Sequence, residues 1–158
     1  MTRSYITIMI ESLEQKSGAL DEIEAIDKLE TQILNADKTD LAAFEANMNK
    51  KDALIKKLDQ LDDGFEATYA KIKTELTENK AAHAEEIKRM QELIRAITEK
   101  TVRIEAAENR NKELLRAKFQ GQRKALRMQK STIRAANAYS DNMRKINKID
   151  SFFVDDKK

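Results

Sequence analysis

Residues 41–76, LAAFEANMNKKDALIKKLDQLDDGFEATYAKIKTEL, carry the pattern that decides the fold. Eleven positions follow one another at alternating intervals of three and four residues, and nine of them are apolar. This is the heptad pattern of a helix that packs lengthwise against another helix. The stretch therefore predicts one long helix with one buried side. The positions are Leu41, Phe44, Met48, Lys51, Ile55, Leu58, Asp62, Phe65, Tyr69, Ile72 and Leu76.

Two positions of the pattern are charged, and a glycine lies within the stretch. Lys51 and Asp62 are charged, although they occupy positions on the side that we expect to be buried. Gly64, in LDDGF, costs a helix about 1 kcal/mol relative to alanine. We interpret Gly64 as a tolerated weak point or a slight bend, and a break in the helix is the alternative.

Two more long helices are predicted, one on each side of this stretch. The first extends over about residues 3–34 and ends at NADKTD, residues 35–40. There Asn35 can cap the C-terminus, and Thr39 or Asp40 can cap the helix that follows over about 40–77. Its apolar positions form a broad stripe: Ile6, Met9, Ile10, Leu13, Leu20, Ile23, Ile26, Leu29, Ile33 and Leu34.

The third helix is predicted over about residues 84–119. It repeats the heptad pattern at Ile87, Met90, Ile94, Ile97, Thr101 and Ile104. Between the second and third helices, ENKAAHA at residues 78–84 places polar Asn79 and His83 in the pattern. We predict a turn there, while a continuous helix with an irregularity in its heptads also fits.

Composition supports a fold made of helices alone. The chain has 158 residues, room for one domain; 37% are charged, 5% are aromatic, proline is absent and only three are glycine. Such a chain forms long helices because nothing interrupts them. We therefore expect an all-α fold, an elongated antiparallel helical bundle or coiled coil of three long helices.

The absence of cysteine excludes disulfides and thiol chemistry. The longest apolar run, YITIMI at residues 5–10, is too short to span a membrane, and no signal-peptide cleavage pattern follows it. These features predict a cytoplasmic protein without stable membrane insertion.

Charge is distributed unevenly along the chain. Residues 1–115 have a balance of −6, and residues 116–158 have a balance of +8. This asymmetry indicates a body and a tail with different roles. We expect the helical bundle to occupy residues 1–119, followed by a basic, labile C-terminal extension, helical or disordered, at residues 120–158.

The tail has an apolar pattern of its own. After Phe119 only one apolar residue per heptad remains, at Leu126 and Ile133, which cannot bury a continuous side. Apolar density then returns, and five positions from Tyr139 to Phe153 share an arc of about 120° on a helical wheel. We interpret this face as a partner-binding element; the alternative is that it packs back on the bundle. The candidate partner-binding residues are Leu126, Ile133, Tyr139, Met143, Ile146, Ile149, Phe152 and Phe153.

Catalysis, cofactor binding and metal binding are not favoured. His83 is the only histidine, and Glu105 and Glu108 form one carboxylate pair without the second pair that a helical metal cage needs. No glycine-rich phosphate loop and no nucleophile motif are present. The sequence therefore predicts a protein that is not an enzyme, with no catalytic residue, no cofactor and no small-molecule substrate.

The basic stretch over residues 116–134 raises the question of nucleic acid. Its positive charges are dispersed around the helix, and no pattern of a nucleic-acid-binding domain accompanies them. It also lacks the dense apolar face with which a helix inserts into a membrane surface. A solvated helical face is the simpler interpretation.

The order of three motifs resembles a known family. NADKTDLAAF forms a short turn, KKDALIKKLDQLDDGF lies in the second helix, and NRNKELLRAKF precedes the polar tail. This order is similar to that of the FlgN-type flagellar export chaperones. One departure is LETQIL before the turn, where that family often has a Glu-Arg pair, so the related FliT-type chaperones are the alternative.

The resemblance implies a cytoplasmic type III secretion chaperone. Such a protein binds a helical end of a hook-associated protein, from the hook–filament junction, and delivers it to the flagellar export apparatus. In the family the C-terminal region commonly engages the cargo or the export gate, and homodimers are possible. Two other functions stay open from the sequence: a structural coiled coil that self-associates, and a basic helical nucleic-acid-binding protein.

Overall fold

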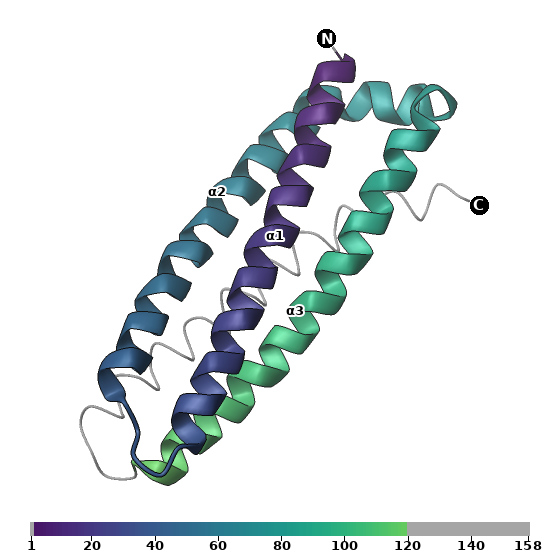
Figure 1. Ribbon diagram of the computed structural model, residues 1–158. Helices are drawn as coiled ribbons and strands as arrows, with labels where there is room; N and C mark the ends of the chain where they lie inside the picture. Colours follow the sequence, from purple (N-terminus) through teal and green to yellow (C-terminus); the bar gives the residue numbers. More distant parts are fainter. Residues whose placement is uncertain (1, 120–158) are drawn as a thin grey trace.

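The computed structural model describes residues 2–119, with side chains from Tyr5 onward. This part contains α1 (Thr2–Asn35), α2 (Leu41–Glu78), the short 3-10 helix η1 (Lys80–His83) and α3 (Ala84–Lys118). Three long helices pack side by side into an elongated bundle, and the described residues include no strand (Figure 1). The all-α fold predicted from the heptad pattern is confirmed.

The first helix lies between the other two. In Figure 1, α1 and α3 descend while α2 runs in the opposite direction. α1 approaches both neighbours within 8 Å between Cα atoms, whereas α2 and α3 come no closer to each other than this limit. α1 therefore supplies the close backbone packing on both sides, and only side chains join α2 to α3.

The helix ends follow from local polar groups. The Asp40 carboxylate accepts a hydrogen bond from the backbone N–H of Ala43 at 3.0 Å and caps the N-terminus of α2. At the other end of α2 the backbone N–H of Asn79 donates to the carbonyl oxygen of Glu75 at 2.9 Å. The chain then passes through η1 into α3, so residues 78–84 form a turn. α2 is continuous through Gly64.

Burial follows the heptad pattern closely. None of the eleven pattern positions in α2 is exposed, and all six named for the third helix are buried. The broad stripe on α1 fails at one position, because Leu29 is 49% exposed. The three-four spacing of buried positions on α1 runs through Asp27, Glu30 and Leu34 and does not include Leu29.

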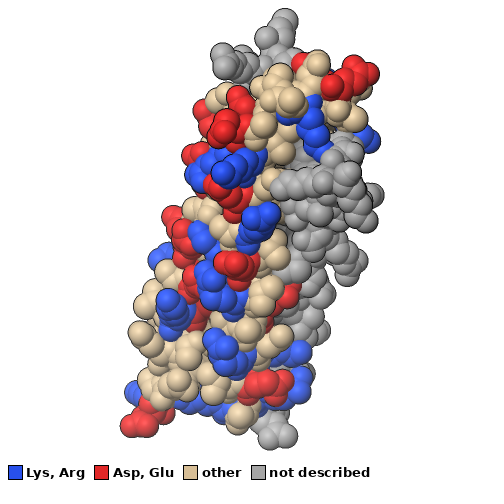
Figure 2. All heavy atoms as spheres, turned by 90° about the vertical axis from the view of Figure 1, so that its right-hand side faces the viewer, with Lys and Arg blue, Asp and Glu red and all other residues tan. Residues whose placement is uncertain are grey.

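The described surface is highly charged. Figure 2 shows Lys and Arg side chains interspersed with Asp and Glu along the visible face, without a large patch of one sign. Within residues 2–119, no helix has the length and apolar character needed to cross a membrane.

Candidate functional site

The residues predicted to bind a partner lie outside the described part of the chain. The structure therefore does not test that prediction. They are Leu126, Ile133, Tyr139, Met143, Ile146, Ile149, Phe152 and Phe153.

The most unusual feature of the described bundle is a buried cluster of charged residues contributed by all three helices. Lys51 on α2 is 2% exposed, and its ammonium group lies among three buried carboxylates. Lys51 Nζ is 3.2 Å from Asp27 Oδ1 and 2.8 Å from Glu30 Oε1, both on α1. It is also 2.8 Å from Glu108 Oε1 on α3. We call these four residues the ionic layer.

Two uncharged side chains extend the ionic layer between α1 and α3. Asn111 Nδ2 donates to the carbonyl oxygen of Asp27 at 3.1 Å. Thr31 Oγ1 donates to Asn111 Oδ1 at 2.6 Å and lies 3.0 Å from the same Asp27 carbonyl. These hydrogen bonds fix the level at which α3 packs against α1, since a shift by one turn would break them.

The ionic layer holds three carboxyl groups and one ammonium group, and the pKa values of two of the carboxyl groups are raised. Burial raises the pKa of Asp27 to about 9, helped by a hydrogen bond to Glu108 that only a protonated carboxyl can donate. Burial also raises the pKa of Glu30 to about 7, against the attraction of Lys51. Burial alone would lower the pKa of Lys51, but the surrounding carboxylates raise it. At neutral pH, therefore, Asp27 is protonated in the folded protein and Glu30 is about half protonated.

Three converging carboxylates can also bind a cation, so this alternative needs a test. Oxygen atoms of Asp27, Glu30 and Glu108 lie within 4.8 Å of one another. The ammonium group of Lys51 contacts all three, however, and so the chain itself supplies the cation. The geometry is that of an internal salt-bridge network. Glu105, which the sequence paired with Glu108, is not among these carboxylates.

A second buried ion pair lies nearer the other end of the bundle. Lys16 Nζ on α1 is 2.7 Å from Asp62 Oδ1 on α2, and both side chains are buried. The two charged positions in the α2 pattern, Lys51 and Asp62, thus each meet opposite charge on α1. They interrupt the apolar seam without leaving an isolated charge.

Sequence reasoning missed the partners of these two residues, although a signal was present. Continued through polar residues, the three-four spacing of α1 passes through Lys16, Asp27 and Glu30 to Leu34. In α3 the same spacing continues from Ile104 through Glu108 and Asn111 to Leu115. Following only apolar residues therefore hid the polar members of the buried side.

His83 has a modest role. Its Nε2 lies 3.4 Å from Glu75 Oε1, so it links the end of η1 back to the last turns of α2. This agrees with the interpretation of His83 as a residue of the turn.

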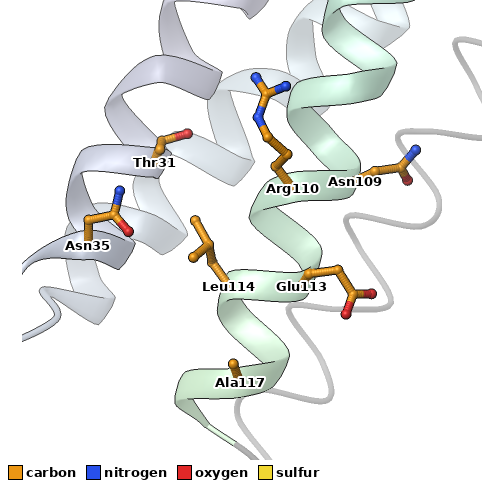
Figure 3. Close-up of a pocket in the computed structure, with 7 residues that line it drawn as sticks. All are labelled: Thr31, Asn35, Asn109, Arg110, Glu113, Leu114 and Ala117. Carbon is orange, nitrogen blue, oxygen red and sulfur yellow. The ribbon is translucent and has the colours of Figure 1, made fainter.

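A hollow of about 620 Å³ opens between α1 and α3 at the end of the bundle where α3 finishes (Figure 3). Figure 3 shows Leu114 directed toward α1, Arg110 extending alongside α3 on the side of α1, and Glu113 directed away from α1. The hollow holds no cluster of groups suited to catalysis. Its lining residues are Thr31, Asn35, Asn109, Arg110, Glu113, Leu114 and Ala117.

A three-helix bundle joined by buried salt bridges does not by itself identify a function. A family model described as "FlgN protein" matches residues 1–145. The chain belongs to the FlgN family. This is a family of flagellar export chaperones, so the resemblance to the FlgN type is confirmed over most of the chain. No curated protein and no solved structure matches the chain.

The match to the FlgN family extends beyond the last described residue. It includes four of the candidate partner-binding residues, Leu126, Ile133, Tyr139 and Met143. The other four, from Ile146 to Phe153, follow the matched region. The family thus covers the bundle and the first part of the tail.

Proposed function

We propose that this protein is a cytoplasmic export chaperone that binds a helical end of a hook-associated flagellar protein and delivers it to the type III export apparatus. The observation that carries this proposal is the FlgN match over residues 1–145. The fold agrees with it, because a rigid bundle of long helices suits binding of another helix better than chemistry on a small molecule.

The tail is the part of the chain that we propose as the binding element. A partner helix is recognised by apolar anchors at intervals of three, four and seven residues, and residues 139–153 have such anchors on one face. Burial of one large apolar side chain contributes roughly 1.5–3 kcal/mol. Six anchors together contribute roughly 9–18 kcal/mol, while ordering roughly 20 residues costs about 20–40 kcal/mol of backbone entropy. Helical hydrogen bonding and packing by the partner must supply the difference, so the tail gains order when it binds.

The bundle is the second part of the proposed chaperone. Most of its large apolar residues lie on the buried sides of the three helices, while Ile8, Leu29 and Val102 are exposed. Residues 2–119 therefore provide a stable body, and we propose that residues 120–158 form a basic, labile extension that gains order when it binds. This proposal predicts that the body folds without the tail, and an experiment can examine this prediction.

The test is co-purification with a defined client. The full chain is co-expressed with a tagged helical terminus of a hook-associated protein, and the complex is measured by size-exclusion chromatography with light scattering. We expect a one-to-one complex. Truncation after Ala138 is expected to abolish the complex and to leave the helical signal and the cooperative melt of the body in place.

Two substitution variants make the test specific for the apolar face. Ile146→Ala combined with Ile149→Ala is expected to weaken binding at least tenfold. The matched control, Ser140→Ala combined with Ser151→Ala, changes the opposite face of the predicted tail helix and is expected to bind normally. Equal loss in both variants, or full binding by the truncated chain, contradicts the proposed binding element.

Light scattering of the chain alone and a titration with plain oligonucleotides distinguish the two other functions. A chain that forms only a concentration-dependent homodimer or filament, and never captures a client, is a structural coiled coil. A chain that binds plain oligonucleotides with a steep salt dependence is a nucleic-acid-binding protein. Either result would overturn the chaperone proposal.

A further inference from the structure

The apolar core of the bundle is divided into two unequal parts. The large cluster extends along all three helices and reaches Ile23 on α1, Leu58 on α2 and Ile104 on α3. The small cluster lies beyond it, at the end of the bundle that holds the α1–α2 connection. Its buried members are Leu34, Phe44, Met48 and Leu115.

The ionic layer lies between the two clusters on every helix. On α1, Asp27 and Glu30 fall between Ile23 and Leu34. On α2, Lys51 falls between Met48 and Leu58. On α3, Glu108 falls between Ile104 and Leu115. Apolar contact, which makes a core cooperative, is therefore interrupted at one level across the whole bundle.

Few buried apolar residues stabilise the end of the bundle that contains the small cluster. It contains four buried apolar residues, against sixteen in the large cluster. Regions with few buried apolar contacts open locally at a lower free energy than the rest of a protein. The end of the bundle beyond the ionic layer, which we call the terminal unit, comprises residues 33–50 and 110–119.

The ionic layer itself is not electrically balanced. The charged groups that face its centre are Asp27 and Glu30 from α1, Lys51 from α2 and Glu108 from α3. Three carboxyl groups thus surround one ammonium group. In addition, Asp27 Oδ2 is buried and accepts no hydrogen bond from any described residue. Unless protons neutralise part of the cluster, closing the terminal unit buries negative charge that water would otherwise solvate.

We propose that the terminal unit opens separately from the rest of the bundle, and that the protonation of the ionic layer sets how often it opens. This device goes beyond the chaperone function and does not depend on it. Opening uncovers the apolar side chains of the small cluster and gives water access to Asp27 and Glu30.

The direction of the pH response follows from the chemistry of the carboxyl groups. In the closed state the pKa of Asp27 is about 9 and the pKa of Glu30 is about 7, so each group stays largely protonated below that pH. In the open state they regain contact with water, and their pKa values move toward those of ordinary carboxyl groups, about 4. Opening therefore releases protons. It becomes more favourable as the pH rises, by up to about tenfold per pH unit for each group that changes its protonation state.

Hydrogen–deuterium exchange measured by mass spectrometry on the full chain tests this proposal. Protection factors, corrected for the intrinsic pH dependence of exchange, are compared at pH 6 and pH 8. For peptides covering residues 44–50 and 110–116 we expect protection to fall at least tenfold. For a peptide covering residues 90–100, within the large cluster, we expect at least tenfold higher protection at both pH values, since these amides exchange only when the whole bundle unfolds.

Isosteric variants link the response to the ionic layer. Glu30→Gln, alone and combined with Asp27→Asn, removes charge while keeping the side-chain shape, and the double variant is expected to reduce the pH effect to less than threefold. Glu22→Gln, an exposed position on the same helix, is the matched control and is expected to behave like the unchanged chain.

Two outcomes overturn the proposal. In the first, the peptides of the terminal unit and of the large cluster show equal protection factors at both pH values, so the bundle opens as one unit. In the second, the double variant folds with a normal helical signal and keeps the full pH response. The comparison within the unchanged chain decides the first point even where the double variant does not fold.

Discussion

Lys51 Nζ lies 2.8 Å from Glu108 Oε1, and this contact joins α2 to α3 although no Cα atoms of the two helices come within 8 Å of each other. The long lysine side chain spans a distance that the backbones do not close. Because Asp27 and Glu30 meet the same ammonium group, one residue ties all three helices together at one level. The lysine thus aligns α2 with both of its neighbours.

Replacing Lys51 by methionine tests this role. The variant keeps most of the side-chain volume but leaves three buried carboxyl groups without their cation. Removing one partner from a buried charge network typically costs about 3–5 kcal/mol of unfolding free energy. Urea denaturation followed by circular dichroism measures the loss. We expect it to be smaller at pH 5 than at pH 8, since protonation then removes part of the uncompensated charge.

Lys56→Met is the matched control for that variant. Lys56 lies on the same helix but is exposed, so its replacement is expected to have little effect. Equal stability of the Lys51→Met protein and the unchanged chain at pH 8 would show that the ionic layer does not hold the helices together.

The stability of the whole protein should also depend on pH. Asp27 and Glu30 have pKa values of about 9 and about 7 in the folded state, above those of the unfolded chain, so the folded protein binds more protons. Stability therefore falls as the pH rises from about 4, by about 1.4 kcal/mol per pH unit for each group that titrates. The contribution of Glu30 levels off above pH 7, and that of Asp27 above pH 9.

The pKa of Lys51 is raised on folding, so its contribution to stability is lost over a different pH range. It is fully present below the ordinary lysine pKa and is lost only at strongly alkaline pH. Thermal melts between pH 5 and pH 9 check the carboxyl contributions without interference from this group. A Glu30→Gln protein should lose less stability than the unchanged chain between pH 5 and pH 7. Identical pH profiles for the two proteins would refute the assignment to Glu30.

The sequence predicted the architecture well because one physical rule dominates it. A three-four spacing places residues on one side of a helix, and every position so identified except Leu29 is buried or half-buried. The preference for side-chain oxygens at helix N-termini gave Thr39 or Asp40 as the cap of α2, and the structure shows that Asp40 is the cap. Leu29 was the exception, since hydrophobicity alone does not say on which side of a helix a residue lies.

The ionic layer could not be predicted in the same way. Lys51 and Asp62 were visible as charged residues in an apolar pattern, but their partners come from helices 21 to 57 residues away in sequence. Which lysine meets which carboxylate depends on how the helices are aligned, and spacing within one helix does not fix that alignment. The candidate binding residues from Leu126 to Phe153 lie outside the described residues, so they stay predictions.

The pair of Lys16 and Asp62 provides a test of whether a buried ion pair adds net stability to the folded protein. Asp62→Ala removes the carboxylate that lies 2.7 Å from Lys16 Nζ, and we expect a loss of about 3–5 kcal/mol. Lys16→Met combined with Asp62→Leu removes both charges and fills the space with apolar groups. This double variant is expected to match or exceed the stability of the unchanged chain.

Glu113→Ala is the control for that comparison. Glu113 forms an ion pair with Arg116 at 3.6 Å in which both side chains are more than half exposed, so its removal should change stability little. Denaturation midpoints of the four proteins give the comparison. A double variant as unstable as Asp62→Ala would contradict the expectation, because it would show that the ion pair itself supplies net stability.

Gly64 lies in the middle of α2, where the helix is continuous and the position is exposed. A Cβ atom added there would meet no atom within 4 Å. Gly64→Ala therefore reduces the conformational freedom of the unfolded chain without a steric cost in the folded state, and we expect a gain of about 0.5–1 kcal/mol. Ala67→Gly, at an exposed position one turn further along, should lower stability by a similar amount. Both values follow from urea denaturation; a loss of stability in Gly64→Ala would mean that the protein requires flexibility at this point of α2.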